Sequence, residues 1–131
     1  MADSRCDSAM FARERPIRKC QNFAALIGFL EQTLESVRGI GELTIYDIAH
    51  RVGAFLGLEP ELVYLHRSTR DGAKVLGIAS KLRMIELSVL PSAFRRLRPY
   101  EMEDALCIYK DELKQLSVKC LARNKRTSGN C

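Results

Sequence analysis

The sequence predicts an all-α or mainly α protein, a compact bundle of about four to six helices. Three observations support this prediction. Apolar residues recur at helical spacing in several stretches, alternating strand patterns are nearly absent, and Gly or Pro stands at the ends of these stretches. With 131 residues, 47% of them hydrophobic and 28% charged, the chain is too apolar for a disordered protein and can bury a core.

The first two helices are expected between residues 23 and 57. The first has an apolar face made of Phe23, Leu26, Ile27, Leu30, Leu34 and Val37. Gly39 and Gly41 then end it. Thr44, with Asp47 three residues later, has the spacing of a capping box for the second helix. Its apolar face is made of Ile45, Ile48, Ala49, Val52, Phe55 and Leu56, and it is expected to end near Gly57.

The middle of the chain predicts shorter elements. Pro60 suits the first turn of a short third helix that runs to about Leu65. Ser68 and Asp71 repeat the capping spacing, so a fourth short helix is expected from about Thr69 to Gly77. The stretch near 82–90 fits a strand, a turn or a helix, and the conformation of residues 78–97 is left open.

Two prolines precede the last predicted helices. Pro91 can begin a short helical turn through Leu97, and Pro99 begins the last long helix. One side of that helix carries Met102, Leu106, Tyr109, Leu113, Leu116 and Cys120.

The domain prediction has three parts. Residues 1–20 form a basic, partly mobile arm, residues 21–122 a single helical domain, and residues 123–131 a flexible tail. The longest apolar run has eight residues, whereas about 20 are needed to cross a bilayer. The N-terminus also lacks the apolar stretch of a signal peptide, so we expect no membrane contact and a cytoplasmic location.

The cysteines and histidines give no cofactor or metal motif. The five cysteines form neither CxxC nor another paired metal-ligand spacing, so we expect no metal and no cofactor. His50 and His66 are kept as an additional candidate site. An enzyme would have to use one of these histidines as base with Cys107 as nucleophile, assembled from separate helices. No nucleotide-binding or nucleophile motif supports a reaction, and we expect no catalytic residues.

Basic residues gather in the central third of the chain. Between Arg67 and Arg98 there are eight basic residues and two acidic ones, a balance of +6, whereas the whole chain has +5. Hydroxyls and cations also stand at the predicted start of the fourth helix, where free backbone amides favour an anion. The candidate anion-binding residues of this basic central face are Arg67, Ser68, Thr69, Arg70, Lys74, Arg95, Arg96 and Arg98. The alternative is a set of solvated cations paired with Glu101, Glu103 and Asp104.

A second candidate lies between the first two helices. The segment LESVRGIGELTIYDIA, residues 34–49, has two glycines, Gly39 and Gly41, around an apolar residue. It resembles the helix-hairpin-helix motif of DNA-binding and DNA-repair proteins. The resemblance covers about 30 residues and implies that the backbone amides of the hairpin contact a DNA phosphate. The alternative is a tight turn that joins two core helices.

These observations predict a small non-enzymatic accessory protein that binds nucleic-acid phosphates through its basic central face. The alternative is a module that binds an acidic protein partner or forms a homodimer through its last helix. An enzyme is the third class. No tryptophan is present and the four tyrosines are scattered, so base stacking is not expected.

Overall fold

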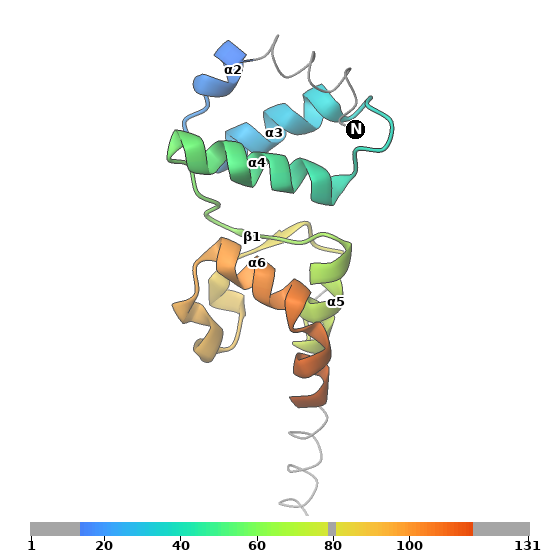
Figure 1. Cartoon of the computed structure of the whole chain (residues 1–131). Coiled ribbons are helices and arrows are strands. Elements are labelled where there is room, and N and C mark those ends of the chain that lie inside the picture. The colour runs from blue at the N-terminus through green and yellow to red at the C-terminus, as the bar shows by residue number, and fades with distance from the viewer. Residues whose placement is uncertain (1–13, 79–80, 117–131) are drawn as a thin grey trace, which may run out of the picture. The chain divides into compact units, whose positions relative to one another are not determined.

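The computed structural model describes residues 14–78 and 81–116. Its helical content confirms the mainly α fold class (Figure 1). The contacts divide the chain into two compact units, the first ending at Glu61 and the second beginning at Leu62. The single domain over residues 21–122 stays a prediction. The predicted tail and the first 13 residues of the predicted arm lie outside the described residues.

The first unit consists of three helices: α2 (Glu14–Arg18), α3 (Phe23–Leu34) and α4 (Glu42–Leu56). The helix α2 lies in the predicted basic arm, where an ion pair between Glu14 and Arg18 at 3.1 Å and the buried Ile17 support one short turn. Asn22 caps α3, since its side chain accepts a hydrogen bond from the backbone of Ala25 at 2.7 Å.

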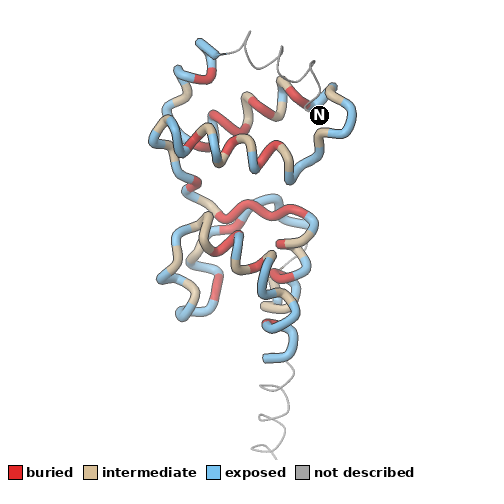
Figure 2. Tube along the Cα trace, viewed as in Figure 1, coloured by how far each residue is buried: buried red, intermediate tan, exposed pale blue. Residues whose placement is uncertain are grey.

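The helices α3 and α4 pack against each other, as their periodicity predicted. Their buried residues are Phe23, Leu26, Ile27, Leu30, Leu34, Ile45, Tyr46, Ala49 and Gly53 (Figure 2). Phe55 was expected on the apolar face of α4, but this is wrong, because its side chain is 77% exposed near the end of the helix. The predicted cap at Thr44 is wrong, because α4 begins at Glu42 with Gly41 at the N-cap position. The predicted end at Gly57 is confirmed: this residue has φ 73°, and Leu58 donates a backbone hydrogen bond to Gly53 at 2.7 Å, as in a Schellman motif.

The second unit combines a small sheet with helices. Its elements are β1 (Val63–Tyr64), α5 (Arg67–Val75), β2 (Met84–Ile85), the 3₁₀ helices η1 (Leu87–Val89) and η2 (Ser92–Arg96), and α6 (Pro99–Ile108). Residues 110–116 are also helical. The two strands pair antiparallel, with Val63 opposite Ile85. The expected short helix after Pro60 is therefore wrong, because Val63 and Tyr64 pair with a distant strand instead.

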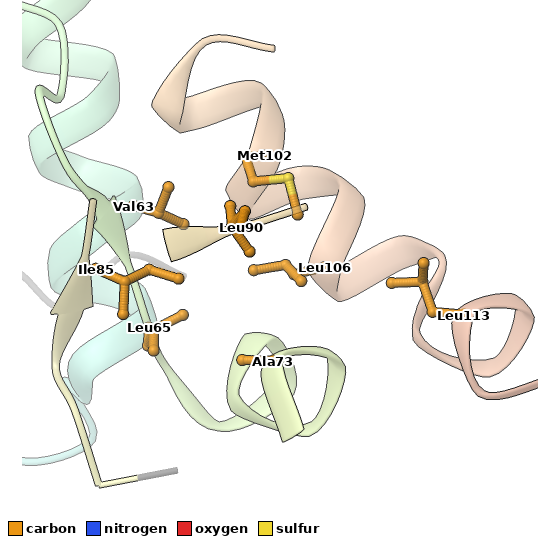
Figure 3. Close-up of a cluster of buried hydrophobic side chains, with 8 residues drawn as sticks. All are labelled: Val63, Leu65, Ala73, Ile85, Leu90, Met102, Leu106 and Leu113. Atoms are coloured by element: carbon orange, nitrogen blue, oxygen red, sulfur yellow. The ribbon is translucent and has the colours of Figure 1, made fainter. Parts of the chain in front are cut away.

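The second unit has a core of its own. Figure 3 shows its buried side chains between the two strands, α5 and α6. They are Val63, Leu65, Ala73, Ile85, Leu90, Met102, Leu106 and Leu113. The core fixes α5 on α6, and α5 carries the first group of predicted anion-binding residues. Among the described residues, no helix has the length and apolar character needed to cross a membrane.

Candidate functional site

Three cations share the outward side of α5. Arg67, Arg70 and Lys74 follow one another at intervals of three and four residues, so they lie within about 60° of one another around the helix axis. Arg67 and Lys74 are exposed and Arg70 is half-buried. Lys74 also stands 3.9 Å from Asp71, an exposed pair of little energetic weight. We call Arg67, Arg70 and Lys74 the α5 cationic face.

The opposite side of α5 packs on α6 without large apolar side chains. Its buried residues are Thr69, Gly72 and Ala73. A Cβ atom at Gly72 would stand 2.3 Å from the backbone oxygen of Leu106, which is closer than any side chain allows. The backbones of α5 and α6 are therefore in direct contact at this glycine, and the α5 cationic face points away from α6.

His66 stands at the N-cap of α5 and links it to α6. Its Nε2 atom contacts Oε1 of Glu103, and the two residues are only 3% and 6% exposed. Removing one partner of a buried hydrogen bond leaves the other group unsatisfied and commonly costs about 1–3 kcal/mol, whereas replacing both by apolar groups of the same shape can be nearly neutral. The pair therefore restricts how α5 and α6 can pack.

Thr69 completes this start of α5. The backbone N–H of His66 donates to the Thr69 hydroxyl at 2.7 Å, and the hydroxyl donates to the carbonyl oxygen of His66 at 2.9 Å. Thr69 is fully buried. Its hydroxyl thus satisfies the backbone of the helix start, and we leave Thr69 out of the α5 cationic face. Ser68, beside it, is half-buried.

The other candidate cations lie in a different part of the second unit. Arg95 and Arg96 belong to η2, and Arg98 directly precedes α6. In Figure 1, η2 lies to the left of α6 and α5 to its right. The basic central face predicted from the sequence therefore divides into two groups, one on α5 and one around η2.

The cations of the second group have separate surroundings. Arg95 donates from Nε to the backbone oxygen of Leu90 at 2.9 Å, a contact that ties η2 to the preceding loop. Arg96 is exposed and lines an open pocket of about 420 Å³ together with Ser92 and Ala93. The backbone N–H of Arg98 donates to the Glu101 carboxylate at 2.7 Å, which caps the start of α6.

The Gly39–Gly41 hairpin belongs to the first unit and is exposed. Gly39 has φ 86°, a left-handed conformation that favours glycine. Gly41 has φ −105° and ψ −177°, extended values that other residues adopt, and a Cβ atom there would meet no neighbour within 4 Å. The fold therefore explains glycine at position 39 but gives no steric reason for glycine at position 41.

The two histidines lie in different units. His50 on α4 is half-buried, and its ring stacks on that of Tyr46 with 5.9 Å between the centroids. Cys107 on α6 is half-buried. Within residues 14–78 and 81–116, no group of three or more His, Cys, Asp or Glu side chains is arranged to hold a metal ion.

Sequence reasoning missed one residue of this site. The alternative interpretation of the basic face placed Glu103 among acids that pair with the cations, but Glu103 contacts His66 at the start of α5. The two residues are 37 positions apart, so no local spacing could reveal the pair. The other two acids remain accessible on α6: Glu101 is half-buried and Asp104 is exposed.

Comparisons with known proteins add no family to these observations. No family model matches the chain, and neither the curated proteins nor the solved structures give a significant match.

Proposed function

We propose that this protein binds nucleic-acid phosphates through the α5 cationic face. The observation that carries the proposal is the arrangement of Arg67, Arg70 and Lys74 on one outward side of a helix whose other side is held against α6. A preformed helix needs no ordering of its backbone on binding, so the entropic cost is confined to the side chains. Cationic side chains are the main source of affinity for a phosphate backbone.

The spacing of the cations on the α5 cationic face suits the phosphates of one nucleic-acid strand. Arg67 and Lys74 are seven residues apart, which corresponds to about 10 Å along the helix axis. This length allows contacts to two or three phosphates. Such contacts supply affinity and orientation but little base choice, so we expect similar binding to all sequences.

The hairpin supplies a secondary support for the same function. Its resemblance to the helix-hairpin-helix motif implies a contact between backbone amides and one phosphate, and the open space at Gly41 is compatible with a close approach. Glu42 follows directly and is exposed, which weakens attraction to an anion. We therefore assign the principal contact to α5.

A salt titration tests the proposal. The intact chain is titrated with random duplex and single-stranded oligonucleotides between 50 and 200 mM salt. Three phosphate contacts predict a slope of log affinity against log salt of about −2.7 on duplex DNA, and thus a loss of about 40-fold over this range. Absence of binding at 50 mM salt contradicts the proposal.

Two triple variants separate the face from overall charge. Arg67→Ala, Arg70→Ala and Lys74→Ala together should weaken duplex binding at least about tenfold at 50 mM salt and flatten the slope. The control replaces three exposed cations elsewhere, Arg15, Arg51 and Lys81, with Ala, and it changes the net charge equally. It should change affinity less than about threefold.

Two outcomes would favour a different conclusion. Equal losses in both triple variants would mean that net charge, and not the α5 cationic face, supplies the affinity. Binding of an acidic polypeptide such as polyglutamate without binding of any oligonucleotide would instead support a protein partner. A further variant, Arg95→Ala with Arg96→Ala, measures whether the group around η2 contributes.

A further inference from the structure

The contact between His66 and Glu103 has a role that differs from ordinary core packing. Both side chains are almost completely buried, and they join two elements that are far apart in the sequence. The neighbouring apolar core already holds α5 on α6 through Ala73, Met102 and Leu106. A polar contact adds direction to this packing, because hydrogen bonds depend on geometry whereas apolar contacts do not.

The contact is placed where it controls the α5 cationic face. The backbone of His66 is fixed by Thr69, and its carbonyl also accepts the N–H of Arg70 at 2.8 Å. Arg67 directly follows His66 in the chain. The residue whose imidazole contacts Glu103 therefore also supplies the backbone groups that bond the first turn of α5.

A second contact along α5 completes the constraint. Gly72 touches the backbone of Leu106, one turn beyond Glu103 on α6. The helix is therefore held at two points, one polar and one steric. The steric contact fixes how close the two helices approach.

We propose that His66 and Glu103 form a positioning pair that fixes the rotation of α5 and so aims its cationic face outward. The consequence for binding rests on the proposed function, whereas the effect on α5 itself does not. Loss of the pair should leave the apolar core in place and allow α5 to turn and open locally.

Matched variants at these two positions test the pair. Glu103→Gln keeps an acceptor for the imidazole, while the double variant His66→Phe with Glu103→Met keeps volume and removes the polar contact. Hydrogen exchange of the α5 backbone amides is the first readout, and the amides of α3 are the internal control. We expect exchange in α5 to rise at least about tenfold in the double variant and less than about threefold in Glu103→Gln.

Oligonucleotide affinity is the second readout. The double variant should lose at least about fivefold in affinity at 50 mM salt while its melting temperature stays within a few degrees of the native value. Glu103→Gln should bind like the native chain. Native α5 exchange together with native affinity in the double variant would overturn the proposal.

The two readouts keep this inference distinct from the proposed function. If the native chain binds no oligonucleotide, the proposed function fails, and hydrogen exchange alone decides the positioning pair. If the double variant does not fold, His66→Asn with Glu103→Met replaces it, since Asn caps a helix well and is too short to replace the imidazole contact. Unchanged α5 exchange in that variant would equally overturn the proposal.

Discussion

The two helix pairs of this protein are packed in different ways. In the first unit, α3 and α4 meet through large side chains such as Phe23, Leu30 and Ile45, which are all buried. In the second unit, the buried residues of α5 are Thr69, Gly72 and Ala73, and the partly buried Val75 packs against the same core. His66, at the start of α5, contacts Glu103. The first pair is held mainly by large apolar side chains, whereas the second combines a shared apolar core with a close backbone approach and one buried polar contact.

The difference in packing between the two helix pairs explains how a polar helix such as α5 is held in place. α5 has the sequence RSTRDGAKV and would gain little by burying apolar area. Its position depends on the fit to α6, and this leaves its outer side free to carry three cations. The α3–α4 pair has greater apolar burial but carries no comparable group of cations on either helix: α3 has none, and α4 has Arg51.

The largest expected change in stability comes from a substitution in the apolar contact between α3 and α4. Leu30→Ala should lower the free energy of unfolding by about 2–5 kcal/mol, because Leu30 is completely buried and its removal leaves a cavity. Denaturant titration measures the change. Leu43→Ala is the control, since Leu43 is 46% exposed and its replacement should change stability by less than about 0.5 kcal/mol. Equal effects would contradict the assignment of Leu30 to the core.

The close approach of α5 and α6 is tested by adding a methyl group at position 72. Gly72→Ala should destabilise the protein by about 2–3 kcal/mol, because the added Cβ would collide with the backbone of Leu106. Gly28→Ala in α3 is the matched control, as nothing lies within 4 Å of its Cβ position. That control should stabilise the protein by about 0.5–1 kcal/mol. A tolerated Gly72→Ala would show that α5 and α6 are not in backbone contact.

The hydrogen bonds at the N-terminus of α5 are tested by a substitution at Thr69. Thr69→Val keeps the volume but removes the hydroxyl that bonds the N–H and carbonyl of His66, and it should cost about 1–2 kcal/mol. In α3, Thr33 offers a control because its half-buried hydroxyl donates to the carbonyl of Phe29 at 2.8 Å within the helix. Thr33→Val should stay within about 0.5 kcal/mol of the native protein in thermal unfolding. Equal losses of stability in Thr69→Val and Thr33→Val would show that the Thr69 hydroxyl has no special role at the start of α5.

The smallest effects are expected in the hairpin. Gly39→Ala should cost about 1 kcal/mol because of its positive φ, whereas Gly41→Ala should leave stability almost unchanged. Oligonucleotide binding then tests the helix-hairpin-helix resemblance, because a methyl group at position 41 would obstruct a phosphate at the hairpin amides. Native affinity in Gly41→Ala would confine phosphate binding to the second unit.

Several features could be predicted from the sequence because they depend on local spacing. The periodic apolar residues of α3 and α4 predicted the two helices and most of their buried sides, although Phe55 is exposed and Tyr46 is buried. Gly57 predicted the end of α4. The helix now described as α5 followed from Ser68, Asp71 and Gly77, although it begins two residues earlier than expected. The three cations of its outward side are also visible as a spacing in the sequence.

Other features depend on partners that are distant in the sequence. Val63 and Tyr64 were expected in a helix because their local pattern allows one, but pairing with β2 places them in a strand. Thr69 was grouped with the anion-binding residues, since nothing local distinguishes a hydroxyl that faces solvent from one that faces α6. Arg95 and Arg96 belong to η2, and the separation of η2 from α5 likewise comes from the path of the chain around α6 (Figure 1).

The mainly helical class, most of the apolar faces of the first unit and the concentration of positive charge in the central third follow from the amino-acid sequence alone. The tertiary structure was needed to show which acid contacts His66 and how the central cations divide between α5 and η2. Helix periodicity and charge are properties of neighbouring residues, whereas the contacts that hold α5 come from residues of α6 that are distant in the sequence. These contacts are the one between His66 and Glu103 and the close approach of Gly72 to the backbone of Leu106.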